Sequence, residues 1–331
     1  MYSRVECCSL LLILLLCAVI PPVSSLAAGN STTYSFVHLS DTQNLATYHP
    51  DTYNLTFSYL DSFREPCNIT AIIITGDLVN TWDSRSEWDT YSRARNHTTI
   101  PVYTIAGNHD ADYGKNYEYY TLYTGQPGGS YMSPVGDFDL VGINYADGTL
   151  TAGEFSRLRA NLTGSSRSFA IIATHYYMDE DGELSPLGKD IDKNLIVKPS
   201  LVLMGHMHAD FIKQRTVGGF PLIADMTNYQ DGVPGGTTGS DYSAGTLYTV
   251  TSVNGRVETL TARVIHIYPT PSFEKEKMVF SLDSKAPLPP GTTIMSGTPA
   301  SSASLCSAGD LFCILNDFFR QCRTDIRRIF S

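Results

Sequence analysis

Short apolar runs alternate along the chain with longer segments whose apolar residues recur at helical spacing. The runs at 34–39, 71–75 and 102–106 have the length and composition of strands. Between them, apolar residues three to four positions apart predict a helix over 53–64, and a second helix with a polar face is expected over 83–96. This order of strand, helix, strand, helix and strand predicts a layered α/β domain.

The second half of the domain continues the pattern and then becomes richer in strands. A tyrosine- and glycine-rich loop is expected over 113–125 and a helix over 152–162. The dipeptide Asn254-Gly255 between two apolar runs is a strong type I′ signal, so 246–264 is predicted to form a hairpin. The other predicted strands are 137–145, 169–174, 200–204, 211–217 and 220–224.

The two ends of the chain have a different composition from the middle. Arg4 precedes an apolar run and then prolines and small residues up to Ala28, the layout of a signal peptide over 1–28; an uncleaved anchor is the alternative. We expect a catalytic domain over 29–270, a Pro/Ser/Thr-rich linker over 271–304 and an amphipathic helix over 305–331. The protein is therefore expected to be secreted or exposed at the cell surface.

Composition and modification motifs agree with export. Four cysteines follow the signal, Cys67, Cys306, Cys313 and Cys322, an even number that suits disulfide formation in an oxidising compartment. Five N-x-S/T sites suggest a glycoprotein: Asn30, Asn54, Asn68, Asn96 and Asn161. The net charge of −10 disfavours a nucleic-acid scaffold, and any phosphate chemistry would need metal ions to hold the anion.

Polar residues that can bind metals follow five of the predicted strands. Chemistry in open α/β sheets collects at the carboxyl ends of strands, so these residues are expected to meet. Carboxylate, amide and imidazole groups together can hold divalent ions. The five motifs are Asp41-x-Gln43, Gly76-Asp77-x-x-Asn80, Gly107-Asn108-His109-Asp110, His175 and Gly205-His206-x-His208.

In this order the five motifs resemble the pattern of the calcineurin-like metallophosphoesterase family, D-x-H, G-D, G-N-H-[D/E], H and G-H-x-H. The resemblance covers about 34–264. It implies a four-layer αββα sandwich of two mixed sheets and an enzyme, a metal-dependent phosphoric ester hydrolase. In this family two metal ions hold a bridging hydroxide that attacks the phosphate ester.

The resemblance also assigns roles to residues. One metal ion would be held by Asp41, Gln43, Asp77 and His208, and the other by Asp77, Asn108, His175 and His206, with Asp77 as the bridge. Asn108 and His109 would contact the phosphate. His109 would act as the general acid that protonates the leaving oxygen, and Asp110 would orient its imidazole.

Two positions depart from the family pattern. Gln43 stands where a histidine is usual, which makes the first site richer in oxygen and favours manganese or iron, with zinc still possible. Gln43 could instead lie outside the metal's direct ligands. Asn80 stands where purple acid phosphatases carry a metal-ligating tyrosine, which disfavours that coloured subtype.

Several alternatives stay open from sequence. The enzyme could be a nucleotide phosphodiesterase, or the chain could be a non-catalytic metal-binding scaffold, although His109 argues against the latter. His38 is expected to pack beneath Asp41 or to support the metal ligands, and the tyrosines of 113–120 to pack in the loop or line the pocket. The C-terminal helix could dock on the domain, self-associate or touch a membrane surface.

Overall fold

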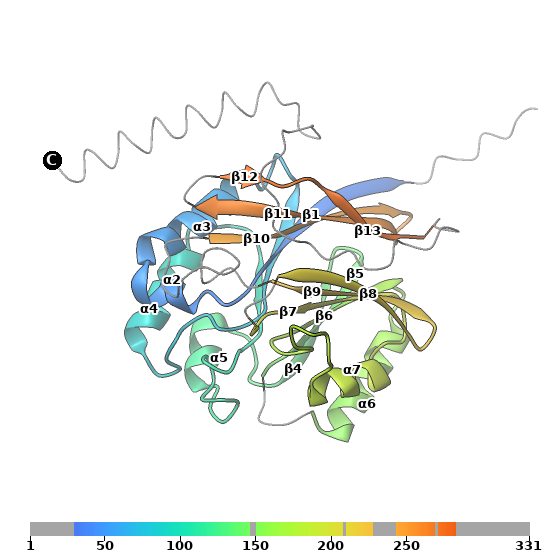
Figure 1. Cartoon of the computed structure of the whole chain (residues 1–331), viewed down its shortest axis with the longest axis horizontal. Helices are drawn as coiled ribbons and strands as arrows, with labels where there is room; N and C mark the ends of the chain where they lie inside the picture. The colour runs from blue at the N-terminus through green and yellow to red at the C-terminus, as the bar shows by residue number, and fades with distance from the viewer. Residues whose placement is uncertain (1–29, 146–149, 208–209, 228–242, 269–270, 283–331) are drawn as a thin grey trace, which may run out of the picture.

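The computed structural model describes residues 30–145, 150–207, 210–227, 243–268 and 271–282. Two mixed β-sheets lie face to face, and helices cover their outer faces (Figure 1). Three hydrophobic clusters fill the spaces between these layers. The predicted four-layer α/β sandwich is confirmed.

The first sheet has the strand order β12-β11-β10-β1-β2-β3, with β13 also paired to β11. The pairs β1–β2 and β2–β3 are parallel, whereas β10 joins β1 and β11 in antiparallel fashion. The turn between β10 and β11 has positive φ at Asn254 and Gly255, as the predicted type I′ turn requires. The strands are β1 Ser31–Leu39, β2 Ile69–Ile74, β3 Val102–Thr104, β10 Ser243–Val253, β11 Arg256–Tyr268, β12 Ser272–Phe273 and β13 Lys277–Ser281.

The second sheet has the order β4-β5-β6-β7-β9-β8. Its four central strands run parallel, and β4 and β8 close the edges in antiparallel fashion. The parallel strands are almost entirely buried, which explains their near-continuous apolar sequences. The strands are β4 Ser130–Val135, β5 Phe138–Ile143, β6 Phe169–Thr174, β7 Ser200–Met204, β8 Phe211–Val217 and β9 Phe220–Met226.

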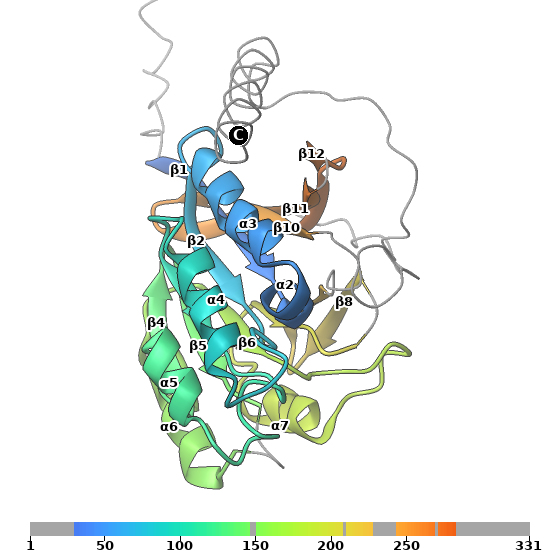
Figure 2. The ribbon, with the colours of Figure 1, turned by 90° about the vertical axis from the view of Figure 1, so that its left-hand side faces the viewer.

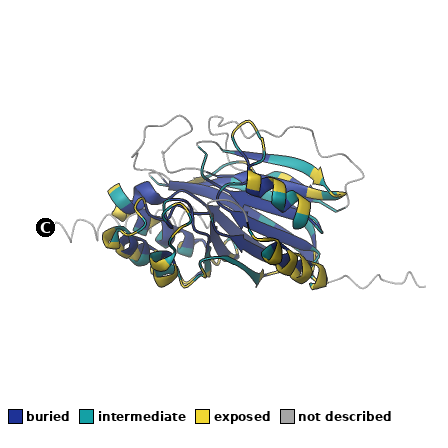
Figure 3. Cartoon of the chain, turned by 90° about the horizontal axis from the view of Figure 1, so that it is seen from below, coloured by how far each residue is buried: buried dark blue, intermediate teal, exposed yellow. Residues whose placement is uncertain are grey.

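The helices pack on the outer faces of the two sheets. Figure 2 shows α2, α3 and α4 side by side over the first sheet, and α6 and α7 pack on the second. Their outward faces are exposed while the strands between them are buried (Figure 3). The helices are α2 Gln43–Tyr48, α3 Pro50–Ser62, α4 Arg85–Arg95, α5 Glu118–Thr124, α6 Ala152–Gly164 and α7 Pro186–Asn194. None of the helices in the described ranges is long and apolar enough to cross a membrane.

Alternation along the strands of the first sheet explains how its two faces are buried. In β2, Ile72 and Ile74 face the helices, whereas Ile73 faces the second sheet. In β1, Val37 and Phe36 divide in the same way. Successive side chains of a strand point to opposite faces, so an unbroken apolar run serves two cores at once.

The predicted loop over 113–125 contains a helix, α5. Tyr120 is fully buried there, and its hydroxyl donates to the carbonyl of Thr104 at 2.8 Å. Gly125, with φ 72°, ends the helix in the left-handed conformation. The sequence suggested a loop because the segment is rich in tyrosine and glycine, but most of the tyrosine rings pack against the helical layer. The helices α2 and α7 and the strand β4 were likewise not predicted from the sequence.

The first sheet extends beyond residue 270, where the domain was predicted to end. β12 and β13 both pair with β11, and Phe280 packs against Phe169 with ring centroids 4.9 Å apart. Residues 271–282 therefore belong to the folded domain, because Val279 and Phe280 are buried between the sheets. The predicted signal peptide, the rest of the linker, the C-terminal helix with its three cysteines, and His208 lie outside the described residues.

Candidate metal centre

The residues singled out by the five motifs meet at the carboxyl ends of the strands. Asp41 and Asp77 follow β1 and β2 of the first sheet, and Asn108 follows β3. His175 and His206 follow β6 and β7 of the second sheet. The site is thus built from both sheets and exists only where they pack together.

Three of these residues have an unusual backbone conformation. Asp41, Asp77 and His206 have φ values of 55°, 54° and 73°, in the left-handed region that costs a non-glycine residue on the order of 1 kcal/mol or more. The surrounding backbone holds them there: the amide of Asp41, for example, donates to the carbonyl of Gly76 at 3.0 Å. Strained residues of this kind cluster at functional sites, where the strain aims a side chain.

The glycines of the motifs make room for the carboxylates. A Cβ atom on Gly107 would lie 2.0 Å from Oδ1 of Asp77, and one on Gly205 would lie 2.1 Å from Oδ2 of Asp41. Both distances are far below van der Waals contact, so any side chain would displace the acidic group. Gly107 and Gly205 are therefore part of the site, although they have no side chain that could bind a metal.

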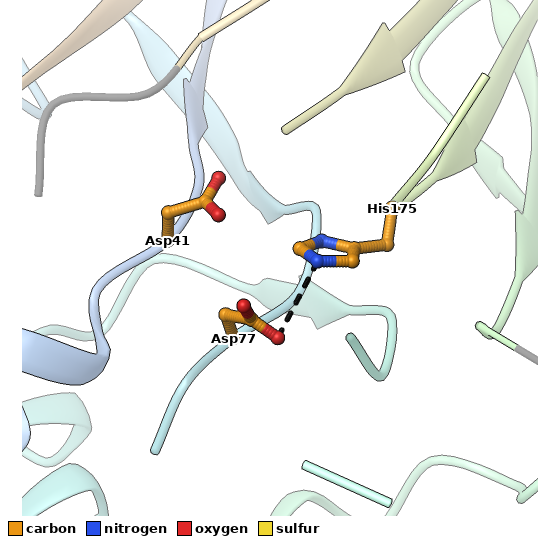
Figure 4. Close-up of side chains that lie close together, drawn as sticks. All are labelled: Asp41, Asp77 and His175. Atoms are coloured by element: carbon orange, nitrogen blue, oxygen red, sulfur yellow. Dashed lines mark ion pairs between the residues drawn. The ribbon is translucent and has the colours of Figure 1, made fainter. Parts of the chain in front are cut away.

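Asp41, Asp77 and His175 form the centre of the cluster (Figure 4). Each offers one possible ligand atom, and these atoms lie within 4.8 Å of one another. Nε2 of His175 lies 3.4 Å from Oδ1 of Asp77. All three side chains are buried, so this is a candidate metal-binding group shielded from bulk water.

Asn108 and His206 complete this arrangement. Oδ1 of Asn108 lies 3.0 Å from Nε2 of His175 and 3.0 Å from Nδ1 of His206. Nδ1 of His175 donates to the carbonyl of Thr75 at 2.7 Å, so the neutral ring has its lone pair on Nε2. That lone pair faces the oxygens of Asn108 and Asp77, which are also acceptors. Only a proton or a cation can satisfy such a set, and a metal ion fits it.

The charges of the site agree with this interpretation. Burial alone would lower the pKa of His175, but the negative charges of Asp77 and Asp41 raise it to about 9. Burial raises the pKa of Asp41 to about 7. Burial also disfavours the charged form of Asp77, but the positive His175 and hydrogen bonds hold its pKa below the usual value. In the metal-free protein, a proton on His175 thus supplies the charge that a cation would supply.

Gln43 lies against the cluster, at the start of α2. Its Nε2 donates to Oδ2 of Asp77 at 3.3 Å. Its Oε1 is buried and has no hydrogen-bond partner among the described residues. A buried amide oxygen without a donor is costly, and a cation beside it would remove that cost. The side chain therefore fits the predicted role of Gln43 as an oxygen ligand.

His109 lies outside this cluster. Its backbone amide donates to Oδ1 of Asp77 at 3.1 Å, whereas Nδ1 of its ring donates to the carbonyl of Asn80 at 2.7 Å. A carbonyl can only accept, so this contact fixes the tautomer and leaves Nε2 to exchange a proton. The ring of Tyr113 lies nearby, with centroids 6.4 Å apart.

Asp110 does not orient the imidazole of His109, and this part of the sequence prediction is wrong. Its Oδ1 accepts hydrogen bonds from the backbone amides of Leu78 and Val79 at 2.8 and 3.1 Å. Its Oδ2 accepts a hydrogen bond from the backbone amide of Gly107 at 2.8 Å. The carboxylate is completely buried. It ties the loop after β2 to the loop after β3, and the carbonyl of Asn80 holds the His109 ring instead.

Other groups near the site were not identified from sequence. The ring of His206 has Tyr176 and Tyr145 beside it, with centroids 4.8 and 6.1 Å away. The backbone carbonyl of Thr75 accepts a hydrogen bond from His175, but no sequence pattern marks it because every residue has a backbone carbonyl. Asp225 did have a signal, a carboxylate inside the apolar strand β9, and His38 contacts it.

Comparison with known proteins now identifies the family. The profile of the calcineurin-like phosphoesterases matches residues 34–210, which include every described residue of the site. The chain belongs to the calcineurin-like phosphoesterase family. Members of this family of metal-dependent phosphoesterases typically bind two metal ions.

Individual relatives are more distant. The chain is 29% identical over 233 residues to YvnB, an uncharacterised protein of Bacillus subtilis; the match spans 61% of this chain but only 18% of that protein. A purple acid phosphatase from yellow lupin seeds aligns with a TM-score of 0.50 at 14% identity, covering 72% of this chain and 52% of that one. The anchor protein of the inner membrane complex of Plasmodium aligns with a TM-score of 0.48 at 13% identity, over 76% and 90%. The lupin likeness supports the shared fold alone.

Proposed function

We propose that this chain hydrolyses phosphate esters at a centre of two metal ions. The observation that supports catalysis most directly is the placement of His109. Its ring donates a hydrogen bond to the carbonyl of Asn80 at the edge of the cluster, and the backbone amide of His109 donates to Asp77. A histidine anchored in this way, but not used as a ligand, is suited to proton transfer.

The proposed ligands form two overlapping sets. Asp77, Asn108, His175 and His206 would hold one ion; Asp41, Gln43, Asp77 and His208 would hold the other. Oδ1 of Asp77 lies near His175 and its Oδ2 near Gln43, so the two oxygens of this carboxylate face the two sets. When bound, the ions would supply Lewis acidity at phosphorus and lower the pKa of the attacking water.

The side chains of the protein would then do the remaining work. The protonated ring of His109, donating from Nε2, would give its proton to the leaving oxygen. The amide nitrogen of Asn108, whose Oδ1 faces the two histidines of the cluster, would help to hold the phosphate. Because His175 and Asp41 are completely buried, the charges of the ions that they would hold would act on the phosphate with little screening by water.

The donor set also bears on which metals are used. Gln43 adds an amide oxygen where a histidine would add a nitrogen. Oxygen-rich sites suit manganese and iron better than zinc, so we propose manganese or iron for the site that contains Gln43.

The proposal can be tested with purified protein stripped by a chelator and then reloaded with manganese, iron or zinc. Hydrolysis of a phosphomonoester and of a nucleotide diester should be followed for each metal. We expect no turnover in the stripped protein and recovery with manganese or iron. Preference for the diester would indicate a nucleotide phosphodiesterase. A protein that binds metal but hydrolyses neither ester would instead be a metal-binding scaffold.

We also propose that the chain is exported and glycosylated. The proposal is supported by the signal-like N-terminus and by the exposure of the sequon asparagines Asn68, Asn96 and Asn161. Asn54 differs, because its Oδ1 is buried in α3. Expression in a eukaryotic secretory system followed by enzymatic deglycosylation should shift the mass of the secreted protein, and mapping should find Asn96 modified and Asn54 unmodified. An unmodified secreted chain would contradict the proposal.

A further inference from the structure

A histidine and an aspartate are paired in the core between the two sheets. Nδ1 of His38, in β1, lies 2.7 Å from Oδ2 of Asp225, in β9. Both side chains have 0% exposed surface. Two ionisable groups this far from water are expensive to bury, so their presence between apolar layers requires an explanation.

The positions of His38 and Asp225 in the two sheets suggest why the pair is buried. His38, in β1, precedes Asp41 by three residues along the chain. Asp225 is the register partner of Leu203 in β7, which precedes His206 by three residues. The pair therefore crosses the interface between the sheets just below the point where the backbone amide of His206 contacts Asp41.

The other nitrogen of the His38 ring contacts the end of β2, the strand that leads into Asp77. Nε2 of His38 lies 2.8 Å from Oγ1 of Thr75, at the end of β2. The carbonyl of the same Thr75 accepts Nδ1 of His175 at 2.7 Å, and Thr75 lies two residues before Asp77. The ring thus contacts the residue that fixes His175 and leads into Asp77.

Stability alone is a weak reason for such a pair. Replacing buried ionic or polar pairs with apolar residues of similar size is often neutral or stabilising, because the cost of desolvation disappears. By contrast, groups that orient metal ligands from behind commonly change metal affinity about 10–100-fold when they are removed. The contacts of His38 match the second role.

We propose that His38 and Asp225 are positioning residues that hold the two halves of the metal centre at metal-binding spacing. The pair sets the distance between β1 and the β7–β9 pair, and through Thr75 it fixes the orientation of His175. The inference rests on the metal centre proposed above, since positioning has meaning only if the ligands bind metal.

The test compares metal affinity with stability in the full chain. A double variant, His38→Leu with Asp225→Val, fills the space with apolar groups; Asp225→Asn keeps the shape and an acceptor oxygen. Manganese binding is measured by equilibrium dialysis, and unfolding by urea. We expect the double variant to bind manganese about 10–100-fold more weakly while it remains folded, and Asp225→Asn to retain most of the affinity.

A buried ion pair in another part of the fold provides the matched control. Nζ of Lys198 lies 3.0 Å from Oδ2 of Asp139, at the amino ends of the strands and so away from the centre. Lys198→Met should destabilise the fold but leave manganese affinity unchanged. Wild-type affinity in the double variant, or an equal loss in Lys198→Met, would overturn the positioning role.

Two further outcomes also decide between the proposals. If the double variant does not fold, Asp225→Ala is compared with Asp225→Asn, and equal manganese affinity in these two would overturn the inference. A wild-type chain that binds no manganese, iron or zinc would overturn the metal centre itself. If the wild type binds metal and the folded double variant or Asp225→Ala binds it equally tightly, only the role of His38 and Asp225 is overturned.

Discussion

The backbone amide of His206 lies 3.1 and 3.0 Å from the two carboxylate oxygens of Asp41 and donates to them. This contact joins the carboxyl end of β7 in one sheet to that of β1 in the other. Because the proposed ligand residues are divided between the sheets, metal binding should be coupled to folding. The contact also explains why His206 adopts its unfavourable backbone conformation, which aims its amide at the carboxylate.

His109 should act in chemistry and not in metal binding, because its ring contacts Asn80 and lies outside the ligand cluster. His109→Ala should retain its metals but lose about 10²–10⁴-fold in rate on an alkyl phosphate, with a smaller loss on an aryl phosphate, whose leaving oxygen needs little protonation. Steady-state rates on the two esters check this. His97→Ala, at an exposed histidine, is the control. Equal losses on both esters would contradict a general-acid role.

Gln43 should influence which metal binds. Gln43→His replaces the buried, unpartnered amide oxygen with an imidazole nitrogen, which should raise the affinity for zinc relative to manganese. Competition between the two metals, followed by elemental analysis, measures the ratio. An unchanged ratio would show that this side chain only supports Asp77 through its hydrogen bond.

The close packing at Gly205 should make it intolerant of any side chain. In Gly205→Ala the added methyl group would need the space of Oδ2 of Asp41 and Oγ of Ser40, 2.1 and 1.9 Å away. We expect lost metal binding, measured by calorimetric titration with manganese. Gly164→Ala is the matched control, because within the described part of the chain no atom beyond its own helix and chain neighbours lies within 4 Å of the added methyl group. Normal metal binding in Gly205→Ala would contradict the packing of Asp41 described above.

Protons and metal ions should compete for the centre. The pKa of His175 is raised from 6.5 to about 9, so its protonation stabilises the metal-free fold at low pH, and this stabilisation is lost as the pH rises from 6.5 through 9. Asp41, raised from 3.8 to about 7, acts in the same direction at lower pH. The increase in Tm on adding manganese should therefore be larger at pH 9 than at pH 6, as thermal unfolding at both values will show.

The same competition predicts proton release when metal binds near pH 7. Calorimetric titration with manganese in two buffers of different ionisation enthalpy measures the number of protons released. His175→Asn should release fewer protons, because it lacks the imidazole whose pKa is raised to about 9 in the metal-free protein. Binding without proton release would contradict the protonated His175 of the metal-free state.

The sequence predicted which side chains lie together where a residue of a motif comes shortly after an apolar strand. Asp41 and Asp77 follow parallel strands of the first sheet, and His175 and His206 follow parallel strands of the second, so each pair meets at one edge of its sheet. The role of Asp110 could not be predicted in this way, because it depends on which backbone amides the next loop presents. The β-strand pattern likewise could not show that His38 and Asp225 meet, since they come from different sheets.

Among the helices, length decided what could be predicted. The eleven or more residues of α3, α4 and α6 show their periodicity clearly. The six- and seven-residue helices α2 and α5 do not, because fewer than two turns leave almost no pattern. α2 nevertheless places Gln43 against Asp77, so a short element missed in the sequence contributes to the site.

The most direct test of the account is the metal content of Asp77→Asn. Asp77 has one oxygen near His175 and the other near Gln43, so it should contact both metal ions. Elemental analysis of protein purified without chelator should find close to two ions per chain in the wild type and few in Asp77→Asn, with wild-type content in a control at the exposed Asp89→Asn. Full metal content in Asp77→Asn, or a wild type without metal, would contradict a two-metal centre built around Asp77.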